Sequence, residues 1–321
     1  MKISGFSMAR NASKLYYPIR EAIESILPIV DEFVVAIGKS DPDDTTRKEI
    51  EAINDPKIKI IDTEWDIERY PNGMENAHQT DIAKSYCTGD WLFYLQADEV
   101  VHEKYLSTIK NYCQHFYNDS NVEGFIFHYR HFWGDYNHYL ISHTWYKNEI
   151  RIIRNDPDIH SWISAQSFRR IPNFDGKNYR QKKNTYKLKV IQVPAEIYHY
   201  GWVRPPSLMQ KKNKALDTIH KGEKLAGKLY ETKQQQFDYG VLNKIPEFKE
   251  THPAVMKQRI KNFYWGNELN YSSKKHPSQI KHRHEKLKYR LLTFFEEKFL
   301  GGKSINKKNY ILLKKKPGTN L

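Results

Sequence analysis

Short apolar segments alternate with helix-like segments through the first hundred residues, and this alternation constrains the fold more than any other feature. Four apolar runs have the length and composition of buried strands: residues 3–7, 33–37, 58–62 and 91–95. Residues 17–29 and 74–87 read as helices, and the first of them places Ile19, Ile23 and Ile26 on one face. Strands that alternate with helices form βαβ units, so the sequence predicts an α/β fold with a mostly parallel sheet.

Polar clusters follow three of these expected strands, at residues 6–11, 38–45 and 96–99. In a parallel sheet the carboxyl ends of neighbouring strands meet at one edge, and ligands bind just outside that edge. The sequence therefore predicts that the three clusters come together and form a binding site.

A second β-rich part, residues 120–205, has loops rich in Trp, Tyr and His. Further strands are expected at residues 123–130, 149–154, 187–193 and 195–200. Pro205 and Pro206 end this pattern, and the composition then shifts to Lys, Gln, Asn and Tyr with helical spacing. We therefore expect an α/β domain over residues 1–205 and a basic, mainly helical region over residues 206–321.

Charge is distributed unevenly along the chain, whose formal net charge is +14. Residues 1–180 hold 21 basic and 27 acidic side chains, whereas residues 181–321 hold 31 basic and 11 acidic ones. A part this basic suits an anionic partner such as a nucleic acid or a membrane surface. Hydrophobic residues make up 39% of the chain, which excludes a wholly disordered protein.

Other features bear on the location of the protein. No apolar run approaches the roughly 18 residues that a membrane-spanning helix needs. The first residues read directly into a strand, without the apolar segment of a secretory signal. Two cysteines, Cys87 and Cys113, do not make a disulfide framework. A reducing, cytoplasmic setting is the expectation.

The segment 89–99, GDWLFYLQADE, ends a buried strand in two adjacent carboxylates, Asp98 and Glu99. A hard cation such as Mg²⁺ or Mn²⁺ prefers oxygen ligands, and proteins often hold it with one or two carboxylates plus substrate phosphates. Asp98 is the candidate ligand, while Glu99, on the opposite side of the strand, could hold neighbouring loops. The alternative is an acidic strand end that binds nothing.

Four segments resemble, in the same order, the GT-A glycosyltransferases of the family 2-like type: residues 3–11, 34–45, 78–83 and 89–99. The resemblance covers about residues 1–155 and extends more weakly to about residue 205. It implies an inverting enzyme with the GT-A fold. Such an enzyme moves a sugar from a nucleotide-diphosphate donor to a hydroxyl of a glycan or lipid-linked acceptor, with Mn²⁺ or Mg²⁺ as cofactor.

The resemblance also implies roles for individual residues. Donor-binding residues at the first two strand ends would be Ser7, Arg10, Asn11, Ser40, Asp43 and Asp44. Asp98 matches the metal-binding carboxylate of the family's acidic motif, but Gln96 replaces the first carboxylate and brings hydrogen bonds without charge. His199 resembles a late metal-binding histidine of some GT-A enzymes, or it is a packed ring. Arg204 could neutralise the donor diphosphate.

An inverting transfer needs a general base that takes the proton of the acceptor hydroxyl. The acidic pair that usually supplies it in the family does not occur between Glu99 and the basic C-terminal part. Glu149 is the first candidate because its strand resembles the family's acceptor side, with Asp158 and Asp156 as alternatives. Glu149 could equally be a polar residue at a strand start.

Aromatic residues and a basic helix indicate where an acceptor would bind. Three indoles could stack on sugar rings or pack in a core: Trp133, Trp145 and Trp162. Residues 281–300 form an expected helix with apolar residues on one face and Lys and Arg on the other. Such a helix could lie on an anionic membrane or dock on the protein. Two alternatives remain open: a nucleic-acid-binding protein, which would need a motif not found here, and an inactive GT-A-like protein.

Overall fold

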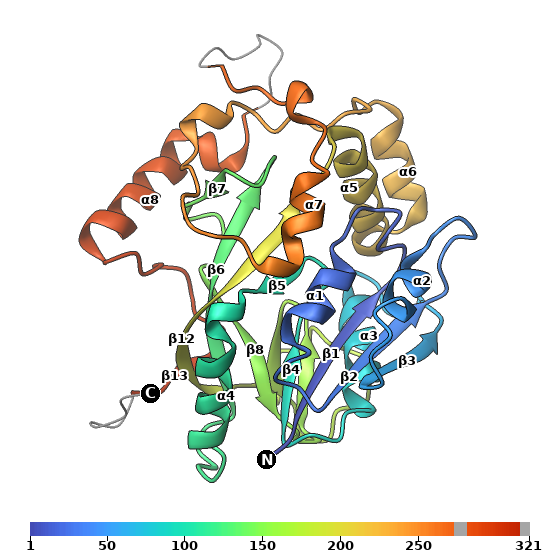
Figure 1. Ribbon diagram of the computed structural model, residues 1–321, viewed down its shortest axis with the longest axis vertical. Coiled ribbons are helices and arrows are strands. Elements are labelled where there is room, and N and C mark those ends of the chain that lie inside the picture. The colour runs from blue at the N-terminus through green and yellow to red at the C-terminus, as the bar shows by residue number, and fades with distance from the viewer. Residues whose placement is uncertain (273–280, 315–321) are drawn as a thin grey trace.

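A mixed β-sheet forms the centre of the computed structural model, which describes residues 1–272 and 281–314 (Figure 1). Along the sheet the strands follow the order β13 (Ile311–Leu312), β12 (Lys189–Trp202), β6 (Gly124–Trp133), β8 (Asn148–Arg154), β4 (Trp91–Tyr94), β1 (Ile3–Ala9), β2 (Glu32–Gly38) and β3 (Ile58–Thr63). Strands β3, β2, β1 and β4 run parallel to one another. β8 is antiparallel to β4 and β6, and β12 is again parallel to β6. The expected α/β fold with a mainly parallel central sheet is confirmed.

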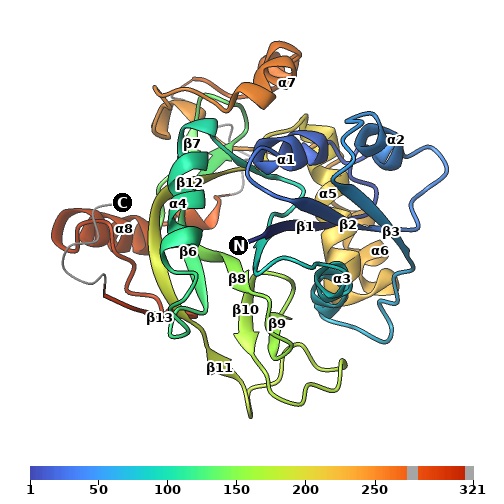
Figure 2. The same ribbon diagram turned by 60° about the horizontal axis from the view of Figure 1, so that its bottom comes forward.

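Helices and a small second sheet cover the two faces of the main sheet (Figure 2). One face packs against α1 (Ile19–Ile26), α2 (Thr46–Glu51) and α4 (Leu106–His115). The other face packs against α3 (Met74–Ser85) and against β9 (Ile159–Trp162) and β10 (Ser167–Arg170). In this second sheet, β10 lies between β9 and β11 (Tyr186–Lys187). Ile19, Ile23 and Ile26 are fully buried, as their spacing predicted.

Strand β12 combines the two strands that were expected at residues 187–193 and 195–200. It runs for 14 residues, with Pro194 inside it. The register against β6 shifts between Gln192 and Glu196, because a proline has no N–H to give to the ladder. Further along, β12 pairs antiparallel with β5 (Glu99–Val101), and this pairing places His199 opposite Glu99. The late histidine therefore lies beside the acidic motif.

The chain after residue 205 packs against the ends of β6 and β12. It holds α5 (Pro206–Lys221), α6 (Glu223–Glu231), α7 (Lys257–Lys261) and α8 (Leu287–Phe299). Short 3-10 turns and a two-residue strand complete the described elements: η1 (Glu103–Tyr105), η2 (Leu242–Lys244), η3 (Ala254–Met256), η4 (Gly266–Glu268), η5 (Arg283–Glu285) and β7 (Tyr139–Leu140). Trp133 and Tyr200 from the sheet form one hydrophobic cluster, rich in aromatic rings, with Met209 and Trp265 from the C-terminal region. The two parts of the chain thus share a core.

Helix α8 presents its apolar residues to solvent. Five of them are 47 to 69% exposed: Leu287, Leu291, Phe294, Phe295 and Phe299. The opposite side is anchored by Glu296, which is fully buried and lies 2.7 Å from His143 Nδ1 and 3.1 Å from Lys147 Nζ. Across residues 1–272 and 281–314, no helix is long and apolar enough to cross a membrane.

Candidate active site

A cavity of about 500 Å³ opens at the carboxyl ends of β1 and β4. The chain after β1, the turn after β4, the end of β12 and helix α5 all contribute to its wall. Six of the residues expected from the sequence line it: Arg10, Asn11, Gln96, Asp98, Trp145 and His199. This is the sheet edge at which the strand ends were predicted to form a site.

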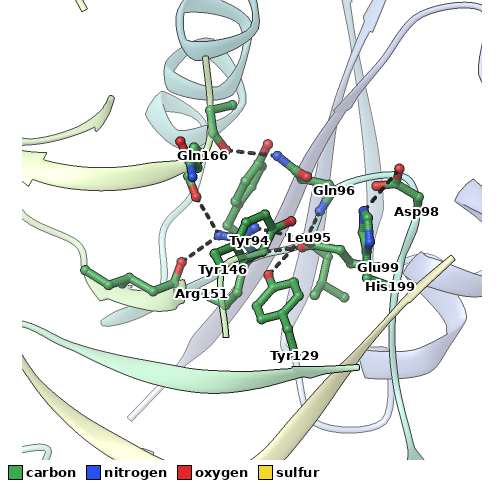
Figure 3. A network of polar contacts seen from close by, with 12 residues as sticks. Tyr94, Leu95, Gln96, Asp98, Glu99, Tyr129, Tyr146, Arg151, Gln166 and His199 are labelled. Carbon is green, nitrogen blue, oxygen red and sulfur yellow. Dashed lines mark hydrogen bonds and ion pairs between the residues drawn. The ribbon is translucent and has the colours of Figure 1, made fainter. Parts of the chain in front are cut away.

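Asp98 lies in the turn between β4 and β5 and is 6% exposed. Its Oδ2 lies 3.6 Å from Nε2 of His199 (Figure 3) and 3.4 Å from Nζ of Lys212 on α5. Burial alone would raise the pKa of Asp98, but Lys212 and His199 hold that pKa well below its usual range. Asp98 is therefore a buried carboxylate that its neighbours keep ionised.

His131 on β6 orients the ring of His199 through a hydrogen bond between their Nδ1 atoms. His131 Nε2 lies 2.7 Å from the carbonyl oxygen of Tyr146, which can only accept, so Nε2 carries the proton. Burial and the neighbouring His199 hold the pKa of His131 well below its usual value, so its Nδ1 is an acceptor. His199 Nδ1, 3.0 Å away, must then donate to it. Nε2, on the side of Asp98, is therefore the ring nitrogen of His199 that could serve as a metal ligand.

Asp98 and His199 fit a divalent cation of the kind expected from the sequence. A Cβ atom at Gly201 would lie 2.6 Å from both Asp98 Oδ2 and His199 Nε2, so the glycine leaves a space that both donor atoms border. Mg²⁺ and Mn²⁺ often take one or two protein ligands and complete their shell with phosphates and water. Within the described residues no cluster of three or more His, Cys, Asp or Glu side chains suits a metal, so the remaining ligands would come from substrate and solvent.

Glu99 and Arg151 form a buried ion pair under the turn that carries Asp98 (Figure 3). Arg151 donates from Nε and Nη2 to the two oxygens of Glu99, both at 2.7 Å. Glu99 also accepts from the hydroxyl of Tyr129 at 2.8 Å and from the backbone N–H of Gln96 at 3.0 Å. Glu99 therefore holds neighbouring segments together, the role that its place on the strand suggested.

Arg10, Asn11 and Trp65 form the opposite wall of the cavity, at the ends of β1 and β3. The guanidinium of Arg10 lies 5.6 Å from the centroid of the Trp65 ring. Asn11 has a positive φ of 53° and ties two loops together. Its side chain accepts from the N–H of Asp41 at 2.8 Å, and its own N–H donates to Ser40 Oγ at 3.0 Å. A flat ring beside a cation offers a place for a nucleotide base.

Several expected donor residues lie next to this wall without lining the cavity. Ser7 is buried, and its hydroxyl donates to the carbonyl of Leu95 at 2.6 Å. Asp43 pairs with Lys14 at 2.7 Å, and Asp44 accepts from the backbone N–H of the same lysine. These contacts order the loops behind the cavity.

Arg204 is fully buried and also lies outside the cavity lining. Its guanidinium lies 4.5 Å from the centroid of the Tyr17 ring, and its Nη1 donates to the carbonyl of Leu15 at 2.7 Å. Because Tyr17 itself lines the cavity, Arg204 contributes positive charge from behind that ring.

The expected catalytic and acceptor residues divide between three places. Glu149 and Trp162 line a second cavity of about 530 Å³, and Trp145 lines both cavities. Asp158 lies 3.5 Å from Arg170 in the turn after β8, outside both linings. Trp133 is 2% exposed, and its indole N–H donates to the carbonyl of Tyr239 at 2.8 Å inside the aromatic core.

Lys212, Arg151 and Trp65 line the first cavity and were not identified from the sequence. Trp65 comes shortly after the third expected strand, so the rule that strand ends meet at one edge could have found it. Arg151 lies inside a strand segment, where nothing in the pattern shows which neighbour it faces. Lys212 carries no signal of its own, because it is one of many lysines in the basic part.

Comparison with known proteins returns solved structures at low sequence identity. One is TarS from S. aureus, 14% identical over 68% of this chain and 39% of its own, with a TM-score of 0.36. A second is the glucosyl-3-phosphoglycerate synthase of Mycobacterium tuberculosis in complex with Mg²⁺ and UDP, 18% identical over 40% of this chain and 44% of its own, with a TM-score of 0.29. A third is a mannosyltransferase of Pyrobaculum calidifontis in complex with GDP-Man and Mn²⁺, 20% identical over 39% of this chain and 34% of its own, with a TM-score of 0.30.

The matched part spans less than half the length of each of these proteins. No protein-family model and no curated protein matches the chain.

Proposed function

We propose that this protein is a glycosyltransferase that takes a sugar from a nucleotide-diphosphate donor with the help of Mn²⁺ or Mg²⁺. The observation that carries the proposal is the pair formed by Asp98 Oδ2 and His199 Nε2, which border one space above Gly201 in a cavity at the sheet edge. A donor of this class would place its base against the wall formed by Arg10 and Trp65 and its diphosphate near Asp98.

Different residues would contribute to such a transfer in different ways. A bound divalent ion would offset the negative charge of the departing diphosphate. Lys212 places a further ammonium beside Asp98 and the cavity, where it can pair with a phosphate oxygen. Gln96 Nε2 donates to the carbonyl of Ala165 at 2.9 Å and holds the turn against the loop across the cavity.

We further propose that the transfer inverts the anomeric centre, with Glu149 as the general base. Burial raises the pKa of Glu149 to about 7, despite the nearby guanidinium of Arg151, and this value suits a base that works near neutral pH. Asp158 is the second candidate; its ion pair with Arg170 makes it the weaker base.

Calorimetry with UDP and GDP, each with and without Mn²⁺, tests the donor site. Wild-type protein should bind at least one of them more tightly with Mn²⁺, and Asp98→Asn, which keeps the shape of the side chain, should lose that gain. Asp175→Asn, which changes an exposed carboxylate outside the lining of either cavity, is the matched control. Equal Mn²⁺-dependent binding by wild type and Asp98→Asn would contradict the metal role.

We also propose that helix α8 binds the inner face of an anionic membrane as a peripheral contact, which would place the enzyme near a lipid-linked acceptor. Its exposed apolar residues are flanked by Lys286, Lys288 and Arg290, and such helices bind anionic bilayers. Sedimentation with phosphatidylglycerol vesicles should retain wild-type protein and release Leu291→Glu/Phe294→Glu.

Two outcomes would contradict the membrane contact. A control variant, Leu225→Glu on α6, removes an apolar side chain that is 50% exposed elsewhere on the surface and should still sediment with the vesicles. If it is released as well, the binding does not belong to α8. If wild-type protein does not bind vesicles but binds duplex DNA at about 50 mM salt, the nucleic-acid alternative is favoured instead.

A further inference from the structure

A second cavity, of about 530 Å³, lies beside the one proposed to hold the donor. Its wall comes from β8, from residues 162–167, and from the segment 301–312 that follows α8. Trp145, Tyr146 and Gln166 line both cavities, so the two share one wall. A molecule in the second cavity would therefore lie next to a donor sugar in the first.

The interior of this cavity is built from buried polar atoms and aromatic rings. Glu149 is 5% exposed, and its Oε2 has no hydrogen-bond partner among the described residues. Asn148 and Asn309 line the same cavity, and the Oδ1 atom of each is buried without a hydrogen-bond partner among the described residues. Trp162 and Tyr310 complete the lining. Unpaired polar groups next to flat rings are what hydroxyl groups and the apolar face of a sugar would satisfy.

Three lysines of the same segment, Lys303, Lys307 and Lys308, line this cavity and are exposed. None of them is within ion-pair distance of a carboxylate in the region that the structure describes, whereas Lys147, also in the lining, is paired with Glu296. The cavity therefore combines an uncharged or weakly charged interior with uncompensated ammonium groups. A ligand that matches it has sugar hydroxyls at one end and an anion at the other.

We propose that the second cavity binds a saccharide that carries a phosphate group, and that this saccharide is the acceptor of the transfer. The assignment as acceptor rests on the proposed glycosyltransferase function; the binding of a sugar phosphate does not. Phosphate is favoured over carboxylate because the lysine segment directly continues α8, the helix whose apolar face is exposed (Figure 1). A sugar linked to lipid through phosphate would present its anion at this level.

Ligand-observed NMR without nucleotide or metal tests the binding directly. The probes are glucose 1-phosphate, glucose, glucuronate and inorganic phosphate. Glucose 1-phosphate should bind at least about tenfold more tightly than each of the other three, because it alone meets both the polar interior and the lysines. Equal binding of glucose and glucose 1-phosphate would overturn the phosphate assignment, as would equal binding of glucuronate. Equal binding of inorganic phosphate would overturn the saccharide assignment.

Two variants locate the site. Lys307→Glu/Lys308→Glu changes exposed side chains and should weaken glucose 1-phosphate about tenfold or more, while Lys48→Glu/Lys110→Glu, the same change on α2 and α4, should not. Trp162→Ala should weaken glucose and glucose 1-phosphate alike. If the lysine variant and its control behave identically, the cavity is not the site.

The same preparations titrated with UDP and GDP in the presence of Mn²⁺ separate the two proposals. Retained nucleotide binding with no sugar-phosphate binding would refute the second site alone. Sugar-phosphate binding without any nucleotide binding would leave this site standing and refute the proposed glycosyltransferase.

Discussion

Glu149→Gln should change how the stability of the protein depends on pH. Glutamine has nearly the same shape as glutamate and cannot titrate, so the variant removes one buried ionisable group and little else. Burial raises the pKa of Glu149 from 4.5 to about 7 in the folded protein. At about 1.4 kcal/mol per pKa unit, this shift corresponds to about 3 kcal/mol of folding free energy.

The sign follows from which state holds the proton more tightly. The folded protein keeps Glu149 protonated up to about pH 7, whereas the unfolded chain releases the proton near pH 4.5. The stabilisation that the raised pKa of Glu149 gives to the folded protein is therefore complete below about pH 4.5, declines as the pH rises, and is lost above pH 7. Between pH 4.5 and 8, the free energy of unfolding of wild-type protein should fall by about 3 kcal/mol relative to that of Glu149→Gln.

Urea unfolding of both proteins at pH 4.5, 6 and 8 measures this difference. Glu68→Gln, an exposed neutralisation on the same chain, is the matched control and should run parallel to wild type. If wild type and Glu149→Gln also run parallel over this range, Glu149 does not carry a raised pKa, and its proposed role as base loses its support.

Three further substitutions test the geometry of the site. Lys212→Met should destabilise the protein by about 3–5 kcal/mol, because Asp98 is left buried without its ammonium partner. Mn²⁺ should restore much of the lost melting temperature. If the variant is as stable as wild type without Mn²⁺, the pair is unimportant for stability. Arg151→Met should lower the free energy of unfolding, measured in urea, by about 3–5 kcal/mol, because it leaves Glu99 buried without its cationic partner. A loss below about 1 kcal/mol would refute a buried pair. His131→Phe removes the acceptor that orients His199. The affinity for Mn²⁺ in the presence of UDP, measured by electron paramagnetic resonance, should fall about 10–100-fold while the secondary structure stays unchanged. Unchanged affinity would disprove the orienting role.

Local sequence patterns predicted the architecture well where the pattern itself determines burial. The apolar runs became β1 to β4 because a strand covered on both faces needs apolar residues throughout. The three-and-four spacing of Ile19, Ile23 and Ile26 placed α1 on the sheet. The inward face of helix α3 does not follow from its apolar residues, since Tyr86 at its end is 52% exposed, while the polar Glu75 and Gln79 are buried and hydrogen-bonded to each other.

The sequence by itself determined that strand ends gather at one edge, and this alone places Arg10 and Asp98 in one cavity. The tertiary structure decided the rest. The pairing of β12 with β5 brings His199 to Asp98 across a hundred residues, and α5 turns one lysine among many, Lys212, toward the same carboxylate. Parallel strands align their ends through local hydrogen bonding, which a pattern reveals. The contacts of a single polar side chain depend instead on which distant segment packs against it, and no local spacing encodes that choice.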